Sequence, residues 1–124
     1  MAKPVGFTDK DEKTVELLIA ANVPKNIAKA LVFLTKKEEA ISQEIEATTG
    51  LRQPEVSLAM QEMRSQGWVT KRDIKKEGKG RPVHAYKLAK PLSEIIGKIE
   101  SDQKKRIEDI QSNMARLSEL LGIG

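Results

Sequence analysis

The sequence predicts a mainly α-helical protein with one small β-hairpin and a long C-terminal helix, and three observations support this fold class. A short helical segment, a turn at Gly50 and a second helical segment starting near Pro54 follow one another. Two strand-like segments then flank a basic, glycine-containing turn at residues 77–82. A helical pattern continues from residue 91 to the end of the chain. This order is that of a winged helix-turn-helix domain, which we place at residues 8–90, followed by a helix at 91–122.

Length and composition limit the classes of protein to consider. The chain has 124 residues, a net charge of +4 and no cysteine, which fits one modest domain with an appended element. It can form no disulfide, and its one histidine cannot assemble a typical zinc site. No segment approaches the roughly 20 apolar residues of a membrane span, and residues 1–8 lack the apolar stretch of a signal peptide. We therefore expect a cytoplasmic protein that needs no metal, cofactor or membrane.

The first two helices have recognisable boundaries. Thr8 is followed three residues later by an acid, a capping-box pattern that predicts a helix start. This helix should end just before Asn22, which readily adopts the left-handed conformation. Pro24 suits the first position of the next helix, which we expect to span Pro24 to Lys37. The predicted inner face of that second helix consists of Ile27, Leu31 and Leu34.

The next two helices form the predicted helix-turn-helix. Ile41 should enter the core, and Ile45 should lie on the inner face of a short supporting helix that Gly50 ends. Pro54 suits the first position of the following helix, because it lacks only an N–H that would be unpaired there, so Gln53 is the expected cap. Helical spacing predicts that the core face of this helix consists of Val56, Met60 and Met63. The outward face is then Glu55, Ser57, Leu58, Gln61 and Arg64.

Leu58 stands out on this outward face. An exposed leucine is common on an ordinary protein surface. In the major groove of DNA, however, a leucine could contact a thymine methyl group. Both interpretations are compatible with the sequence.

The hairpin follows once Gly67 ends the helix. Trp68–Ile74 alternates as a half-buried strand, with Val83–Leu88 as its antiparallel partner. Between residues 71 and 90 there are eight cations and two anions, a local charge of +6. The connecting loop is therefore predicted to be a wing that lies along DNA phosphates. His84 is more simply a phosphate neighbour or an exposed residue than a catalytic one.

At this point the residues resemble a known family. Residues 50–57, of sequence Gly-Leu-Arg-Gln-Pro-Glu-Val-Ser, look like the turn and recognition-helix start of small archaeal and bacterial winged-helix transcription regulators in the MarR, ArsR and TrmB-like group. Residues 66–69, Gln-Gly-Trp-Val, and the Gly-Arg-Pro wing continue the resemblance, which covers residues 41–88. By position it implies base contacts from Gln53, Pro54, Ser57, Leu58 and Gln61. It implies backbone contacts from Arg52, Arg64, Lys79 and Arg81.

This chain departs from that pattern at Glu55. Together with Glu62 it offsets Arg52 and Arg64, so the recognition helix is near neutral and most of the affinity should come from the wing. The metal site of ArsR-type regulators is not expected, because its usual cysteines are absent. The whole predicted DNA-binding surface is Arg52, Gln53, Pro54, Glu55, Ser57, Leu58, Gln61, Arg64, Lys75, Lys76, Lys79, Arg81 and His84.

The C-terminal segment predicts one helix of about 45 Å, at 1.5 Å per residue. Its apolar residues recur at spacings of three and four, with one stutter where Gln103 fills the step between Ile99 and Ile107. The first two turns could pack on the N-terminal helices, whereas the remainder should form a homodimer seam. Gln103 is then either a polar layer that helps to set the register or an exposed residue. The expected dimerisation residues are Ile96, Ile99, Gln103, Ile107, Ile110, Met114, Leu117 and Leu121.

Taken together, these patterns predict a sequence-specific transcription regulator that binds double-stranded DNA as a homodimer. One alternative is a non-specific architectural DNA-binding protein. Another is a winged-helix adaptor for protein interactions in the transcription machinery. An enzyme is not expected, since no catalytic set is visible and the Gly78–Gly80 turn joins two strands, unlike a P-loop.

Overall fold

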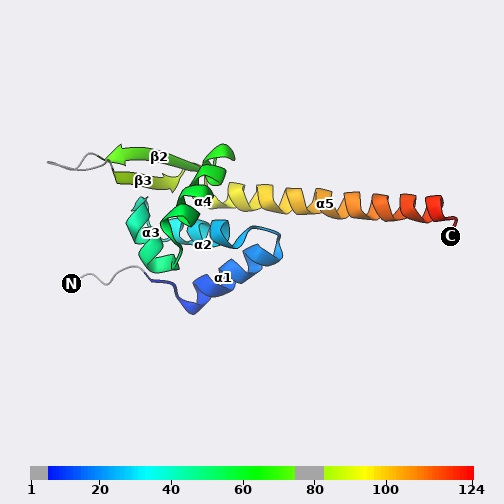
Figure 1. Cartoon of the computed structure of the whole chain (residues 1–124), viewed down its shortest axis with the longest axis horizontal. Helices are drawn as coiled ribbons and strands as arrows, with labels where there is room; N and C mark the ends of the chain where they lie inside the picture. The colour runs from blue at the N-terminus through cyan, green and yellow to red at the C-terminus, as the bar shows by residue number, and fades with distance from the viewer. Residues whose placement is uncertain (1–5, 75–82) are drawn as a thin grey trace.

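The computed structural model describes residues 6–74 and 83–124. Its elements follow in the order α1 (Asp9–Ala20), α2 (Lys25–Leu34), β1 (Ala40–Ile41), α3 (Ser42–Thr49), α4 (Gln53–Ser65), β2 (Val69–Ile74), β3 (Val83–Leu88) and α5 (Leu92–Leu121). Helices α1 to α4 and the small sheet form one body, from which α5 extends as a long rod (Figure 1). The predicted fold class, a winged helix with a long C-terminal helix, is confirmed.

Helix α1 begins where the capping box predicts. The Thr8 side-chain oxygen accepts a hydrogen bond from the Asp11 backbone N–H at 3.2 Å, and the Asp11 carboxylate accepts one from the Thr8 N–H at 2.8 Å. Two donors that would otherwise be unpaired at the helix start are thereby satisfied. After the helix, Asn22 has a φ of 71°, the left-handed conformation that the sequence predicts.

Helix α2 ends at Leu34, earlier than the predicted end at Lys37. The two lysines that follow the helix form ion pairs with neighbouring elements, Lys36 with Asp11 of α1 and Lys37 with Glu44 of α3. These pairs tie the end of α2 to both neighbours. At its other end, α2 begins at Lys25, so Pro24 is the N-cap residue and not the first helical residue as predicted.

Helix α2 is the centre of the core. It packs against α1, α3, α4 and β3, so its apolar residues meet neighbours on several sides. The prediction of one inner face was therefore too narrow, and Ile27, which belongs to that face, is only partly buried. The buried residues of α2 are Ala28, Ala30, Leu31, Val32, Phe33 and Leu34.

The sheet has three antiparallel strands in the order β1-β3-β2. The predicted hairpin strands β2 and β3 pair from Val69 opposite Leu88 to Ile74 opposite Val83. The sequence does not predict β1, because two residues are too few to show alternation and their partners in β3 are far away in sequence. Ile41 therefore lies in a strand and is only partly buried, whereas its neighbour Ala40 is buried.

The predicted inside–outside alternation of β2 is wrong. Val69 is buried, but residues 70–73 are all exposed. Strand β2 lies at the edge of the sheet, and its far end points away from the helices (Figure 1), so neither of its faces is covered there. The central strand β3 supplies the buried residues Ala85 and Tyr86 instead.

Helix α4 begins at Gln53, so the N-cap residue is Arg52 and not Gln53 as predicted. Pro54 still lies in the first turn, where its missing N–H costs nothing. The residues predicted to face the core are all buried, together with Ala59, and comprise Val56, Met60 and Met63.

Helix α5 runs as one helix over the predicted residues. Ile95 and Ile99 are its buried residues, so its first two turns pack on the body of the domain. The remainder extends beyond that body (Figure 1). No helix in residues 6–74 and 83–124 combines the length and the apolar character needed to cross a membrane.

Candidate nucleic-acid interface

The turn between α3 and α4 fixes the direction of the predicted recognition helix. Gly50 has a φ of 77° and ends α3 in the left-handed conformation, which glycine adopts without steric cost. The buried Thr49 hydroxyl accepts a hydrogen bond from the Leu51 N–H at 3.2 Å, and the Leu51 side chain is buried. The residues on both sides of Gly50 are thus fixed by a hydrogen bond and by burial. They orient α4 so that one of its faces packs against the core.

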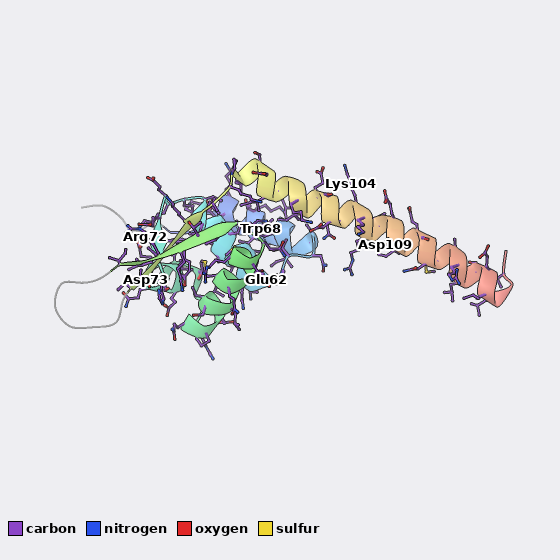
Figure 2. All side chains as sticks on the ribbon, turned by 90° about the horizontal axis from the view of Figure 1, so that it is seen from above. Glu62, Trp68, Arg72, Asp73, Lys104 and Asp109 are labelled. Carbon is purple, nitrogen blue, oxygen red and sulfur yellow. The ribbon has the colours of Figure 1, made fainter. Side chains whose placement is uncertain are left out.

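The opposite face of α4 is a row of exposed side chains. Ser57, Leu58, Gln61 and Arg64 are all exposed, as the sequence predicts. Leu58 is 66% exposed, an unusual position for a leucine on a helix whose other face is fully packed. Figure 2 shows α4 projecting from the body on one side of the sheet, with its side chains extending outward. A protruding helix with a short row of polar and apolar side chains can enter a groove of a partner molecule.

Glu55 occupies a different position from the other predicted contact residues. It is partly buried, and its carboxylate accepts a hydrogen bond from the backbone N–H of Arg52 at 2.9 Å. A carboxylate at this position caps the start of a helix and interacts favourably with the positive end of the helix dipole. The structure therefore assigns Glu55 a role in starting α4. The remaining predicted residues at this end, Arg52, Gln53 and Pro54, are exposed.

The stem of the hairpin, formed by β2 and β3, holds two charge pairs. The Arg72 guanidinium donates two hydrogen bonds of 2.7 Å to the Glu39 carboxylate. This pairing holds the pKa of Glu39 below its usual range and raises the pKa of Arg72. Nδ1 of His84 lies 2.7 Å from the Asp73 carboxylate across the two strands.

These pairs change the local charge balance that the sequence suggests. The Glu39 carboxylate is distant in sequence from the hairpin, yet it offsets Arg72 in space. His84, predicted as a phosphate neighbour, is partly buried and faces Asp73. The stem still presents the exposed cations Lys71 and Lys87. The predicted wing residues Lys75, Lys76, Lys79 and Arg81 lie outside the described residues.

The predicted dimerisation residues divide into two groups. Ile99 is buried in the core of its own chain, Ile96 is 40% exposed and Gln103 is partly buried. Farther along α5 the apolar residues are exposed by 45 to 62% and comprise Ile107, Ile110, Met114, Leu117 and Leu121. Ile95 is fully buried but was missed by the sequence analysis, although its position four residues before Ile99 is a usable signal.

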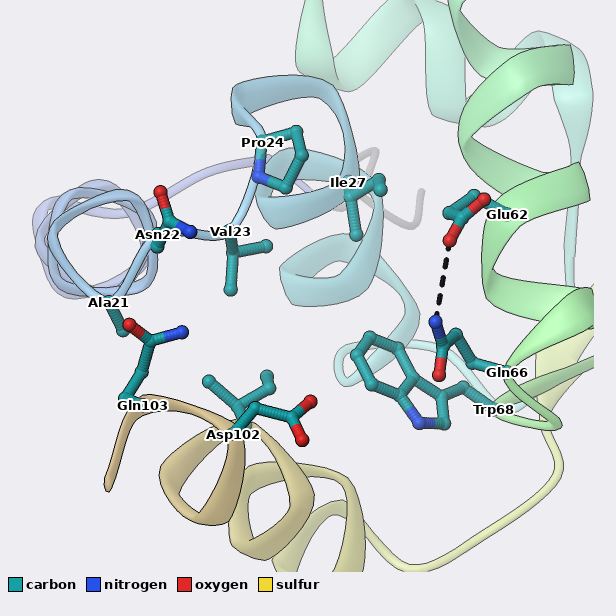
Figure 3. Close-up of a pocket in the computed structure, with 11 residues that line it drawn as sticks. Ala21, Asn22, Val23, Pro24, Ile27, Glu62, Gln66, Trp68, Asp102 and Gln103 are labelled. Carbon is teal, nitrogen blue, oxygen red and sulfur yellow. Dashed lines mark hydrogen bonds between the residues drawn. The ribbon is translucent and has the colours of Figure 1, made fainter. Parts of the chain in front are cut away.

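A cavity of about 390 Å³ lies where α5 leaves the body. Trp68, Val23 and Ile27 line it, and the polar side chains at its rim come from three elements (Figure 3). On one side, Gln66, which follows the last residue of α4, donates a hydrogen bond of 3.4 Å to Glu62 of α4, and Gln103 of α5 lies on another side. In the described part of the chain, no group of three or more potential metal-ligating side chains comes together.

Comparison with known proteins gives a fold and no family. Neither a family model nor a curated protein matches the sequence. Among solved structures, TrmBL2, described as an archaeal chromatin protein with a novel mode of DNA binding, matches with a TM-score of 0.65 at 17% identity over 90% of this chain. This chain spans 41% of the TrmBL2 chain.

Two further solved structures match over most of both chains. A possible transcriptional regulator from Methanosarcina mazei has a TM-score of 0.57 at 16% identity, over 88% of this chain and 94% of its own. A mutant MarR from E. coli has a TM-score of 0.51 at 18% identity, over 91% and 85% of the two chains. At these identities the likeness establishes a shared winged-helix fold.

Proposed function

We propose that this protein is a sequence-specific DNA-binding transcription regulator. The observation that carries the proposal is the exposed face of α4, on which Ser57, Leu58 and Gln61 project from a helix whose opposite face is buried. The fold supports it, since one of the matched structures is described as a possible transcriptional regulator.

Helix α4 has side-chain chemistry suited to reading base edges. Gln61 can donate to and accept from one base, the Ser57 hydroxyl can do either, and Leu58 can contact a thymine methyl group. With Arg52 and Arg64 offset by Glu55 and Glu62, this helix adds little net charge. Cations elsewhere must therefore provide the attraction to phosphates, which dominates affinity for DNA.

The wing is the proposed source of that attraction. Its predicted phosphate contacts are Lys75, Lys76, Lys79 and Arg81, with Lys71 and Lys87 exposed on the stem beside them. Arg72 is a poorer candidate because Glu39 already binds its guanidinium group.

The active form is proposed to be a homodimer joined through α5. A single winged helix contacts only a few base pairs, whereas a two-fold dimer reads two half-sites at a fixed spacing. The exposed apolar residues of α5 from Ile107 to Leu121 provide a surface for such pairing.

Changing Gln61 to alanine tests base readout. A DNA site is first selected from a random library by the wild-type protein, and binding to that site is compared with binding to random DNA. We expect Gln61→Ala to cost about 1–3 kcal/mol on the selected site and to leave binding to random DNA almost unchanged. Equal losses on both DNAs would assign Gln61 to the backbone and contradict its role in sequence readout.

A wing variant tests the phosphate contacts. Lys79→Ala combined with Arg81→Ala should weaken binding to selected and random DNA about equally. It should reduce the slope of log affinity against log salt by roughly 0.9 for each phosphate that the protein no longer neutralises. Lys10→Ala with Lys13→Ala removes the same charge from exposed positions of α1 and should leave the slope unchanged. A wing variant with the wild-type slope would remove the wing from the proposal.

The second candidate function is that of a non-specific chromosomal protein. The fold match to TrmBL2, described as a chromatin protein, favours it, whereas the mixed-charge recognition helix with Leu58 and Gln61 argues against it. The same selection experiment separates the two functions. A protein that binds DNA but enriches no sequence is architectural, and one that binds no DNA at low salt fits an adaptor role.

A further inference from the structure

The exposed stripe of α5 lies on the same face of the helix as its buried residues. Leu117 follows Ile99 by five full turns at 3.6 residues per turn, so the two side chains project in the same direction. Ile99 is 7% exposed because it packs in the core of its own chain, whereas Leu117 is 45% exposed. The face that is covered by the body near the start of α5 is therefore bare farther along.

The body ends near Gln103. This residue is partly buried and lines the same cavity as Ala21 and Asn22, which belong to the turn between α1 and α2 (Figure 3). Figure 1 shows α1 and α2 beneath the first part of α5 and no part of the chain beneath the remainder. The uncovered stripe thus runs from Gln103 to Leu121.

This arrangement restricts how a second copy can pair with the stripe. In a parallel pair, the body of each copy would lie on the seam face at the same end, and the two bodies would compete for the same space. In an antiparallel pair, each body lies beyond the C-terminal end of the other helix. The seam is then free over its whole length.

We propose that α5 pairs antiparallel with α5 of a second copy, with the two-fold axis crossing the seam at the level of residue 112. This inference deepens the homodimer of the proposed function and rests on it. In this register Ile107 lies opposite Leu117 of the second copy, and Ile110 lies opposite Met114 of the second copy. Gln103 lies opposite Leu121, so each helix ends where the body of the other copy begins.

The charges beside the stripe favour the same orientation. Lys104, Lys105 and Arg106 are consecutive and exposed. Arg106 flanks the stripe, whereas Lys105 projects from the opposite side of α5 and Lys104 pairs with Glu100. A parallel pair would place the two Arg106 side chains at the same level, where like charges repel. The antiparallel pair places Arg106 beside the last turn of the other helix, where the negative end of the helix dipole attracts cations.

Leu120 also has a role in this register. It is 73% exposed and lies beside the stripe. In the antiparallel pair it lies near Arg106 of the second copy, whose aliphatic part can cover it. The residues that flank the middle of the seam, Gln111 and Asn113, are uncharged, so no like-charge contact forms at the two-fold axis.

The register sets the separation of the two DNA-binding bodies. The two Ile95 positions would lie about 50 Å apart along the helix pair at 1.5 Å per residue. This exceeds the roughly 34 Å of one turn of DNA. The two half-sites of an operator are therefore expected to lie farther apart than one turn.

Single cysteines provide the test, because the chain has none of its own. Ile107→Cys and Leu117→Cys are oxidised to disulfides separately and as an equal mixture. Each residue lies about 15 Å along the axis from its own copy in the antiparallel pair, too far for a disulfide. Only the mixture should yield covalent dimer, in about half of the chains if subunits exchange freely between isologous pairs. Ser112→Cys, on the side of α5 away from the seam, gives the background from random collisions.

The other outcomes each overturn the proposal. Covalent dimer from each variant alone indicates a parallel pair. Background levels in all samples, with a wild-type protein that sediments as a dimer, indicate another register or another face. A wild-type monomer removes the dimer itself. DNA binding is measured separately on the same wild-type sample, so a failure of the pairing is distinguishable from a failure of the DNA-binding function.

Discussion

Three acidic side chains start helices in this protein. Asp11, Glu44 and Glu55 each accept a hydrogen bond from the backbone N–H three residues earlier, at 2.8 to 3.0 Å. This position satisfies a donor that the helix leaves free and places a negative charge near the positive end of the dipole. Glu44 also pairs with Lys37. Burial raises its pKa, but hydrogen bonds from Lys37 and the Ile41 N–H outweigh burial and hold the pKa below its usual range.

Asp11 allows this role to be measured. The hydrogen bond from Lys36 is the main cause that lowers the pKa of Asp11 below its ordinary 3.8. A carboxylate with a lowered pKa in the folded state stabilises the fold fully above its unfolded pKa, and the effect is lost as the pH falls through the folded pKa. Asp11→Ala should therefore lower the free energy of unfolding by about 1 kcal/mol at neutral pH. The difference should shrink in acid, below pH 3.8.

Thermal unfolding of wild type and Asp11→Ala across this pH range checks the prediction. Lys13→Ala is a suitable control, because its partner Glu16 is 3.8 Å away and both side chains are 70% exposed. Such a surface pair contributes little. A stability difference for Asp11→Ala that does not change with pH would show that the ionised carboxylate is not the stabilising group.

The sequence predicts an interaction between two residues more readily when the residues are close together in the sequence. Thr8 and Asp11 are three positions apart, and their capping box is visible in the sequence. The Arg72–Glu39 pair joins residues that are 33 positions apart, and nothing local marks it. The outward row of α4 was predicted because helical spacing alone fixes it, whereas the capping role of Glu55 required knowledge of where α4 begins.

At the scale of elements, the turn between α3 and α4 depends on Gly50. Its φ of 77° is costly for a residue with a Cβ atom, although an added Cβ would meet no other atom within 4 Å. The cost of Gly50→Ala is therefore conformational, and we expect a loss of about 1 kcal/mol in the free energy of unfolding.

Gly97 is the matched control for that change. It lies inside α5, near the turns that pack on the body, and an added Cβ also meets nothing within 4 Å. Alanine is favoured over glycine within a helix, so Gly97→Ala should stabilise the protein by about 0.5–1 kcal/mol. Urea unfolding of both variants gives the comparison. Changes of the same sign would contradict the conformational explanation.

Local signals also decide which elements the sequence predicts. The bounds of α1, α3 and α5 are predicted closely, because a capping residue or a glycine marks an end of each of these helices. Helix α2 ends earlier than its local pattern predicts, and the two lysines beyond its end, Lys36 and Lys37, pair with α1 and α3. The sequence does not predict strand β1. It predicts alternating buried and exposed residues in β2, a pattern that requires one face of the strand to be packed against other elements. These errors concern tertiary surroundings, which the local pattern does not contain.

At the scale of the whole molecule, α5 connects two functions. Its first two turns complete the core through Ile95 and Ile99, so the direction of the rod is fixed relative to the body and to α4. The cavity at Trp68 and Gln103 lies at this junction. In the proposed dimer, a contact between two α5 rods would therefore also fix the relative placement of the two α4 helices.

Ile110→Asp tests this coupling between pairing and DNA binding. Ile110 is 51% exposed in the single chain, so an aspartate there should not disturb the fold. In the proposed seam it would bury an unpaired charge, which is strongly unfavourable. Sedimentation should show a wild-type dimer and a mutant monomer at the same concentration. Binding to a selected two-half-site DNA should weaken, because a single winged helix contacts only a few base pairs.

Ser112→Asp introduces the same charge on the side of α5 away from the seam and should leave both assembly and DNA binding unchanged. This control separates loss of the seam from repulsion between the added charge and DNA. If Ile110→Asp remains dimeric, the stripe is not the dimer seam. If it becomes monomeric yet binds the selected DNA as tightly as the wild type, one winged helix suffices for recognition and the role of α5 pairing in specificity is wrong.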